Sequence, residues 1–400
     1  MVNNIFFYCP SKKIGGEQQL YIRCSNYLVT HTDANVFYVD YIDGYAQGVL
    51  SEKVIRIDKN QMANYYFEAS TLFIIALSYI DKYYELFNVK QLPESFRVLF
   101  WSLQPYNLTG KILIRNRFNL LLPWQKKKFR DVLYPLCNDG IIRIMDYNNY
   151  HTLHQVFGLD LTEIDYLPVP IDDDGIRSIE EISFSRVCTD KLTFLWLSRI
   201  DHDKKHTLMT IINELDNVNK CHPVLLYVVG DGNALEEVKS YSANKSLEIV
   251  FVGRCFGDKL NSLIDEKVDV GVGMGTSGLE IAKRGKPVIM KMVMKKTQKA
   301  GIVNDYIFLH QEYGYSLGSP DFDVEGQSVF STKVEDLLND YASCARCDYE
   351  YTKRNHSIET TGQLLVRAME KPGMTEEDNM RVYELSKLIR EYRLATFRKG

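Results

Sequence analysis

The chain has 400 residues, of which 45% are apolar and 25% charged, so it is long enough for two domains with well-buried cores. A formal net charge of −4 argues against a general nucleic-acid binder. No apolar run reaches the roughly 20 residues of a membrane span, and the N-terminus lacks the layout of a signal peptide. We therefore expect a cytoplasmic protein. The eight cysteines agree with this compartment, because their spacing is not that of a disulfide framework.

Strands alternate with helices over the first 170 residues. The apolar patterns predict strands at residues 5–9, 35–40, 53–57, 71–77, 97–103 and 140–145, and helices at 17–30 and 119–136. Two prolines, Pro168 and Pro170, then break regular pairing and precede an acidic turn at residues 172–175. We place a domain boundary at residue 170.

The alternation restarts after this boundary. Strands are expected at 192–197, 223–229, 247–252, 268–272 and 287–289, and helices at 204–215, 234–241, 258–265, 333–345, 349–369 and 376–397. Two such runs predict an α/β protein with two doubly wound, Rossmann-like domains that face a cleft. The expected domains are residues 1–170 and 171–373, and an amphipathic helix over 374–400 crosses back to the first.

The stretch from Gly271 to Met290 is typical of an anion site. It combines a strand, a glycine-rich turn, a helix and a second strand. In this arrangement the N–H groups of the first helical turn point at a bound ligand, which we expect to be a phosphate. Ser277 and Glu280 also have the spacing of a capping box. A second loop, Ser198 to His206, carries Arg199 and Lys204 after a strand; a guanidinium can grip two phosphate oxygens while an ammonium acts as a point charge.

These motifs together resemble the retaining glycosyltransferases of GT-B fold, which use sugar nucleotides and serve bacterial capsule and polysaccharide synthesis. The matching residues, in chain order, are Gly15-Gly16-Glu17, Ser198-Arg199 with Lys204, Val228 to Gly232, Val252-Gly253, Gly275 to Glu280 and Gly285 to Ile289. The match is densest over residues 192–290 and thinner over residues 5–171.

The resemblance implies a role for each matching residue. Arg199 and Lys204 would hold the donor diphosphate and stabilise it as leaving group, and Glu280 would accept hydrogen bonds from the ribose. The other donor-binding residues it implies are Gly15, Gly16, Gly253, Arg254, Gly275, Thr276, Ser277 and Gly278. No cofactor is expected beyond a nucleoside-diphosphate sugar as co-substrate.

The sequence departs from the family at two places. Val272 stands where a Glu usually contacts the donor sugar, and Gln104 stands where the first domain often has a His, although Gln cannot take up a proton. Asp146 is a further candidate at the acceptor side, with a helix N-cap as its alternative role. We expect no metal, because the D-x-D spacings at 172–174 and 321–323 fall in turn-like segments.

The segment from Lys111 to Arg130 mixes positive charges with Leu, Ile, Phe and Trp. Such a mixture suits an anionic membrane surface, with Trp124 and Phe129 at the interface, although a basic solvent-facing helix has the same composition. The first reading would bring the enzyme to the inner face of the membrane and to a glycan or lipid-linked acceptor. Two alternative functions stay open: a sugar-nucleotide epimerase of the same fold, and a non-catalytic nucleotide- or glycan-binding protein.

Overall fold

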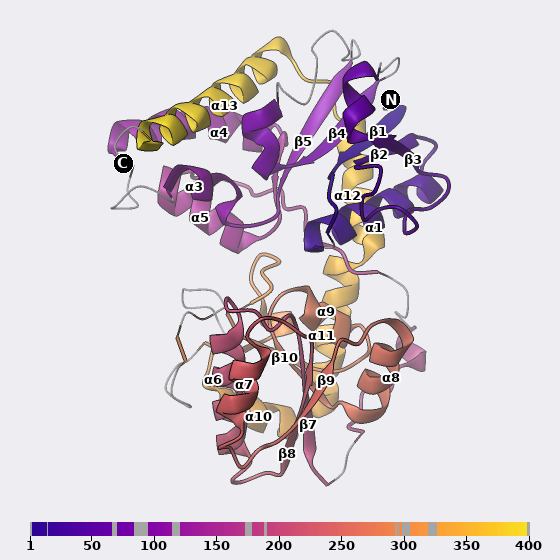
Figure 1. Cartoon of the computed structure of the whole chain (residues 1–400), viewed down its shortest axis with the longest axis vertical. Coiled ribbons are helices and arrows are strands. Elements are labelled where there is room, and N and C mark those ends of the chain that lie inside the picture. Colours follow the sequence, from indigo (N-terminus) through magenta and orange to yellow (C-terminus); the bar gives the residue numbers. More distant parts are fainter. Residues whose placement is uncertain are drawn as a thin grey trace. The chain divides into compact units, whose positions relative to one another are not determined.

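The computed structural model describes residues 2–13, 15–65, 70–83, 95–113, 121–172, 178–187, 190–292, 294, 296–297, 305–318 and 326–397. Its contacts divide the chain into two compact units (Figure 1). Unit 1 consists of Met1–Pro170 together with Ile358–Gly400, and unit 2 of Ile171–Ser357.

Unit 1 is built on a six-stranded parallel sheet with the strand order β3-β2-β1-β4-β5-β6. The strands are β1 Asn4–Tyr8, β2 Asn35–Asp40, β3 Ile55–Asp58, β4 Thr71–Ala76, β5 Phe96–Ser102 and β6 Ile142–Ile144. β1, β2 and β4 are apolar over almost their whole length and buried on both faces, as expected for strands covered by helices on either side.

Helices cover both faces of this sheet. They are α1 Gly16–His31, α3 Tyr106–Leu113, α4 Pro123–Asn138, α5 Tyr147–Phe157, α12 Ile358–Glu370 and α13 Glu376–Phe397, with 3₁₀ turns η1 Lys59–Asn64 and η2 Leu77–Lys82. Alternate residues of β1 point to opposite faces: Phe7 packs in the cluster with α1 and α12, and Phe6 in the cluster with α4, α5 and α13.

The chain returns to unit 1 at Ile358, earlier than the predicted end of the second domain at residue 373. The reason is burial: Leu365 of α12 is fully buried in the same cluster as Leu20 of α1. α13 follows over the residues predicted for it, and Leu385 and Ile389 pack against the other face of the sheet. The C-terminal helix therefore does cross back to the first domain.

Unit 2 repeats the same topology. Its strands are β7 Leu192–Leu197, β8 Val224–Val229, β9 Glu248–Gly253, β10 Val270–Gly273, β11 Val288–Met290 and the short β12 Ile307–Phe308. Its helices are α6 Lys205–Val218, α7 Leu235–Ser242, α8 Gly257–Lys267, α9 Thr276–Ala282, α10 Phe330–Asn339 and α11 Tyr341–His356. Two 3₁₀ turns belong to the same unit, η4 Ile179–Glu181 and η5 Leu309–Gln311. The order is β12-β11-β10-β7-β8-β9, all parallel except the antiparallel edge strand β12.

Both sheets have the strand order of a Rossmann-like domain. In such sheets ligands bind beyond the carboxyl ends of the strands, where the strand order reverses. That point lies between β1 and β4 in unit 1 and between β7 and β10 in unit 2. It is therefore the loops after these four strands that the fold places where a ligand binds.

Candidate functional site

The loop after β7 brings the two predicted cations of unit 2 to this edge. Lys204 precedes α6, and its Nζ donates a hydrogen bond of 2.6 Å to the Ser198 hydroxyl. Burial, and then the neighbouring Arg199 charge, lower the pKa of Lys204. Arg199 is 70% exposed, and its guanidinium contacts Asp201 Oδ2 at 2.5 Å. Lys204 is thus held against the protein, while Arg199 extends into solvent. An anion that contacts both side chains would be attracted by both positive charges and would reduce the repulsion between them.

A close backbone approach fixes this loop. Gly230, directly after β8, has φ +142°, and a Cβ there would lie 1.9 Å from the Ser198 carbonyl oxygen. Its N–H donates to the Gly253 carbonyl at 2.9 Å, and the Ile200 N–H donates to the Asp231 carbonyl at 3.0 Å. Only glycine fits at position 230, so the loop that carries Arg199 rests directly on the end of the next strand.

The glycine-rich turn lies after β10, the strand adjacent to β7. Leu195 pairs with Gly271, so the two strands end level with each other at Leu197 and Gly273. Gly275 is the N-cap of α9 with φ +70° and no contact for a Cβ within 4 Å, so the turn is open there. The N–H groups of Thr276 and Ser277 follow in the first helical turn, where a helix has no internal acceptors.

The capping-box alternative for Ser277 and Glu280 does not match the structure. Ser277 Oγ donates to the Met274 carbonyl at 2.8 Å, and the N-cap of α9 has no side-chain hydrogen bond. Glu280 instead forms an ion pair of 2.6 Å with Lys283. Gly278 serves helix packing, because a Cβ there would lie 2.9 Å from the Met290 sulfur.

Gly253 and Arg254 lie at the end of β9, the outermost strand of this half of the sheet. Arg254 is exposed, and its Nε lies 3.2 Å from Asp231 Oδ2 in the loop after β8. The loops after β7, β8 and β9 thus carry Arg199 and Arg254, each in an ion pair with an aspartate, Asp201 and Asp231.

In unit 1 the switch point carries a partly buried acid, Glu17, to which the sequence assigned no role beyond membership of the Gly15-Gly16-Glu17 motif. Gly15 and Gly16 begin α1 after β1, and Glu17 follows them. The Glu17 Oε1 lies 3.6 Å from the Cys9 sulfur, and burial raises the pKa of both groups. A carboxyl with a raised pKa takes up a proton more readily than an exposed one, as a general base must. No signal in a single sequence distinguishes Glu17 from an exposed first-turn acid.

Gln104 and Asp146 have mainly structural contacts. Gln104 is exposed, and its backbone N–H donates to the Asn107 side chain at 2.9 Å. Asp146 is the N-cap of α5, only 4% exposed, and accepts hydrogen bonds of 2.8 Å from the backbone and the side-chain amide of Asn149. Burial raises the pKa of Asp146 to about 6. The N-cap alternative therefore describes Asp146.

Comparison with solved structures identifies the architecture. A glycosyltransferase from Rickettsia africae matches with a TM-score of 0.56 at 13% identity, over 92% of this chain and 98% of that one. The apo lipopolysaccharide outer core galactosyltransferase WaaB gives 0.55 at 11% identity, over 92% and 98%. Anabaena HepE in complex with UDP-glucose gives 0.53 at 14% identity, over 92% and 99%. The chain has the GT-B fold. No protein-family profile matches it, and no curated protein does.

Within the GT-B fold, Val272 is a core residue. It lies in β10, is 2% exposed and packs among the buried residues of unit 2. The side chain at this position therefore faces the interior of the unit rather than the ligand edge, and its apolar character follows from its burial.

The basic segment divides into a buried and an exposed face, and residues 114–120 lie outside the described part. Phe129 is fully buried, packing against Phe157 and Tyr392 at ring-centre distances of 5.0 and 5.2 Å, so its predicted place at a membrane interface is wrong. Trp124 is 55% exposed, with the Lys128 ammonium 5.5 Å from its ring centre.

No helix in the described ranges is long and apolar enough to cross a membrane. The same residues contain no group of three or more His, Cys, Asp or Glu side chains that could hold a metal ion. Most of the two D-x-D spacings, at residues 173–174 and 321–323, lies outside the part that the structure describes.

Proposed function

We propose that this protein is a retaining glycosyltransferase that moves a sugar from a nucleoside-diphosphate sugar to an acceptor hydroxyl in the synthesis of a cell-surface polysaccharide or glycoconjugate. The supporting observation is the position of Arg199 and Lys204 at the switch point of unit 2, beside the open turn at Gly275. The solved structures of the same fold include a galactosyltransferase and a complex with UDP-glucose.

In the proposed reaction the bond between the anomeric carbon and the diphosphate oxygen breaks, and a bond to the acceptor oxygen forms on the same face. The electron pair leaves with the diphosphate, and the acceptor hydroxyl transfers its proton to an oxygen of the departing diphosphate. Arg199, Lys204 and the N–H groups of Thr276 and Ser277 stabilise the negative charge that develops on the leaving group. No metal ion is needed where these groups supply the positive charge.

Glu280 is proposed to accept hydrogen bonds from the ribose hydroxyls. Its side chain does not cap α9, and the ion pair with the mostly buried Lys283 orients it. Gly253 and Arg254 are proposed to lie along the nucleobase, at the outer end of the same edge.

The exposed face of α4 is proposed to meet the anionic inner surface of a membrane, where a lipid-linked acceptor would be found. Leu122 and Trp124 are each 55% exposed at the start of the helix, and Lys127 and Lys128 follow on its surface. Sedimentation with vesicles tests this contact: Trp124→Ala should weaken binding to phosphatidylserine vesicles and leave the small binding to phosphatidylcholine vesicles unchanged. Equal sedimentation of variant and wild type with the anionic vesicles would remove α4 from the proposal.

The donor assignment is tested by calorimetric binding of UDP and GDP and by transfer assays with a panel of sugar nucleotides. Arg199→Ala should weaken diphosphate binding by about tenfold or more, because a charge-assisted hydrogen bond contributes about 1.5–3 kcal/mol. Lys220→Ala serves as control, because Lys220 is an exposed cation between the end of α6 and the start of β8, at the opposite edge of the sheet. Undiminished binding and turnover in Arg199→Ala would contradict the assignment. Tight nucleotide binding without any transfer or hydrolysis would favour the non-catalytic alternative.

A further inference from the structure

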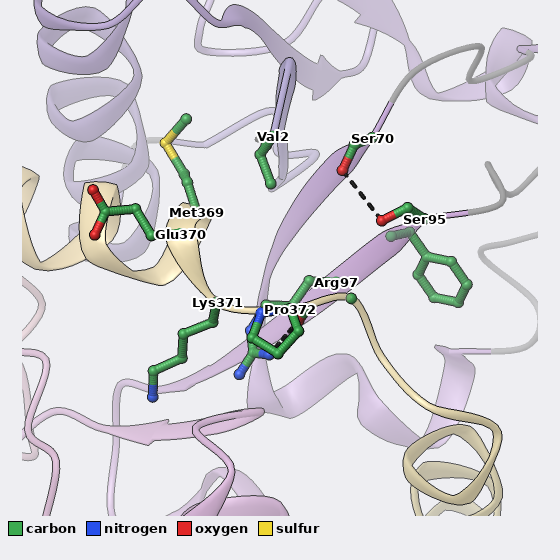
Figure 2. A pocket seen from close by; sticks show the side chains of 10 residues that line it. Val2, Ser70, Ser95, Arg97, Met369, Glu370, Lys371 and Pro372 are labelled. Atoms are coloured by element: carbon green, nitrogen blue, oxygen red, sulfur yellow. Dashed lines mark hydrogen bonds between the residues drawn. The ribbon is translucent and has the colours of Figure 1, made fainter.

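A pocket lies in unit 1, at the sheet edge opposite to the switch point. It has a volume of about 170 Å³ and forms where the β4 and β5 strands begin and the chain passes from α12 to α13 (Figure 2). The residues that line it are Val2, Ser70, Ser95, Phe96, Arg97, Met369, Glu370, Lys371, Pro372 and Gly373. Because it lies at the amino ends of the strands, it is separate from the edge at which a Rossmann-like sheet binds its nucleotide.

Arg97 is a buried cation in this pocket, and its hydrogen bonds go to carbonyl oxygens. It is 6% exposed, and its guanidinium donates to two neutral acceptors, the carbonyls of Pro372, at 2.9 Å, and Asp139. Its Nε–H has no hydrogen-bond partner among the residues that the structure describes. A guanidinium has five N–H donors, so Arg97 has a spare donor, and its charge is offset through space by Asp378 and Asp139 rather than by a direct ion pair with a described residue.

Two further cations are close to Arg97. Arg143, 7% exposed, forms an ion pair with Asp165, and Lys371 Nζ lies 3.7 Å from the same carboxylate. Burial and then the Arg97 charge lower the pKa of Arg143 to about 10. Burial, followed by the charges of Arg143 and Arg97, lowers the pKa of Lys371. Arg143 and Lys371 thus share one carboxylate, and the three positive groups repel one another.

The remaining acids nearby make their contacts with another cation or point elsewhere. Burial lowers the pKa of Arg97, whereas Asp378 and Asp139, within electrostatic range, raise it, but both carboxylates contact Arg381, at 3.5 and 3.6 Å. Glu370 lines the pocket, with its carboxylate turned away from Arg97 (Figure 2). Within the described ranges, the guanidinium of Arg97 therefore contacts no carboxylate directly, and Lys371 shares Asp165 with Arg143.

We propose that this pocket binds a small phosphate group, either free or at the end of a small phosphomonoester, through Arg97 and Lys371. A planar guanidinium matches the geometry of phosphate oxygens, and an ammonium adds a point charge. Ser70 and Ser95, whose hydroxyl oxygens lie 3.5 Å apart, provide uncharged donors on the opposite wall (Figure 2). The volume is below the roughly 300–1,000 Å³ of clefts that hold drug-sized ligands, which limits the guest to a small anion.

Binding at this place would join the connection between α12 and α13 to the start of β5. Arg97 already contacts the Pro372 carbonyl, and the Met374 N–H donates to the Phe96 carbonyl at 2.8 Å. A bound anion would relieve the repulsion between the cations on the two sides of this junction. Phosphate should therefore stabilise unit 1 without any contribution from the nucleotide site.

The test is a titration of the full chain with inorganic phosphate, at constant ionic strength maintained with chloride, followed by thermal unfolding and calorimetry. We expect a saturable rise in the melting temperature of the wild type, because a ligand that binds only the folded state stabilises it by mass action. Lys371→Gln should weaken phosphate binding at least about tenfold, the loss expected for one charge-assisted contact. Lys259→Gln, which removes an equal charge from unit 2, should bind as wild type does.

A phosphate response in unit 2 is excluded by the same titration on Arg199→Ala, which should keep the wild-type response. The proposal is overturned if the wild type shows no saturable response, if Lys371→Gln responds like the wild type, or if Arg199→Ala loses the response. Arg97→Lys should bind phosphate more weakly than the wild type. If this variant does not fold, the phosphate titrations of Lys371→Gln and Ser95→Ala decide whether the pocket binds phosphate. Tighter binding of glucose 1-phosphate than of phosphate identifies an ester as the guest, and weaker binding identifies the free ion.

Discussion

Replacing Gly230 by Ala tests whether the loop that carries Arg199 is held by backbone contact. The new methyl group would lie 1.9 Å from the Ser198 carbonyl oxygen, which is far inside contact distance, and the residue would keep a φ of +142°. A positive φ costs an L-residue about 1–2 kcal/mol, and overpacking adds about 1–3 kcal/mol. We expect the free energy of unfolding of unit 2 to fall by about 2–5 kcal/mol and UDP binding to weaken.

Gly253→Ala is the matched control for stability, because Gly253 also has a positive φ, +78°, but no atom within 4 Å of the added methyl group. It should show only the conformational cost, about 1–2 kcal/mol. Urea unfolding monitored by tryptophan fluorescence measures the stability of both variants, and calorimetry compares UDP binding by Gly230→Ala with that of the wild type. If Gly230→Ala is as stable as Gly253→Ala and binds UDP as tightly as the wild type does, the backbone contact does not hold the loop.

Three further substitutions test residues of unit 1. Because burial raises the folded-state pKa of Asp146 to about 6, the stability from its protonated form is present below about pH 4 and lost as the pH rises through 6. The unfolding free energy of wild type, relative to Asp146→Asn, should therefore fall by about 1.4 kcal/mol between pH 5 and pH 7.5 in urea titrations; a difference that does not change with pH contradicts the shift. Phe129→Ala should cost about 3–5 kcal/mol in the same assay, whereas Trp124→Ala, at an exposed site, should cost less than about 1 kcal/mol, and equal losses would contradict the burial of Phe129.

The fold was predictable because most strands are apolar runs with polar boundaries. β2 and β7 have the predicted bounds, since each is bounded by polar residues and buried along nearly its whole length. The break between α11 and α12 was not predictable. No Gly or Pro marks Ser357, and the break is held by a tertiary contact in which the Ile171 N–H donates to the His356 carbonyl at 2.8 Å. The two-residue strand β12 is likewise too short for any periodicity.

The candidate site was predictable to the extent that it depends on local order along the chain. A strand followed by a glycine or a basic loop locates Arg199, Lys204 and Gly275 at a ligand edge without knowledge of their neighbours. The raised pKa of Glu17 and the burial of Arg97 follow from tertiary packing rather than from the local sequence pattern. Arg97, for instance, receives its acceptors from Asp139 and Pro372, which a sequence pattern does not connect to it.

Unit 1 is discontinuous, because Ile358–Gly400 completes a domain begun by Met1–Pro170. During synthesis, the roughly 190 residues of unit 2 must emerge before α12 and α13 exist, which at about 5–20 residues per second takes some 10–40 seconds. Throughout that interval the surfaces later covered by Leu365 and Leu385 stay exposed to the surroundings of the ribosome. We therefore expect chaperones to bind the incomplete chain. Mutations in α12 or α13 should lower the amount of folded protein before they lower its activity.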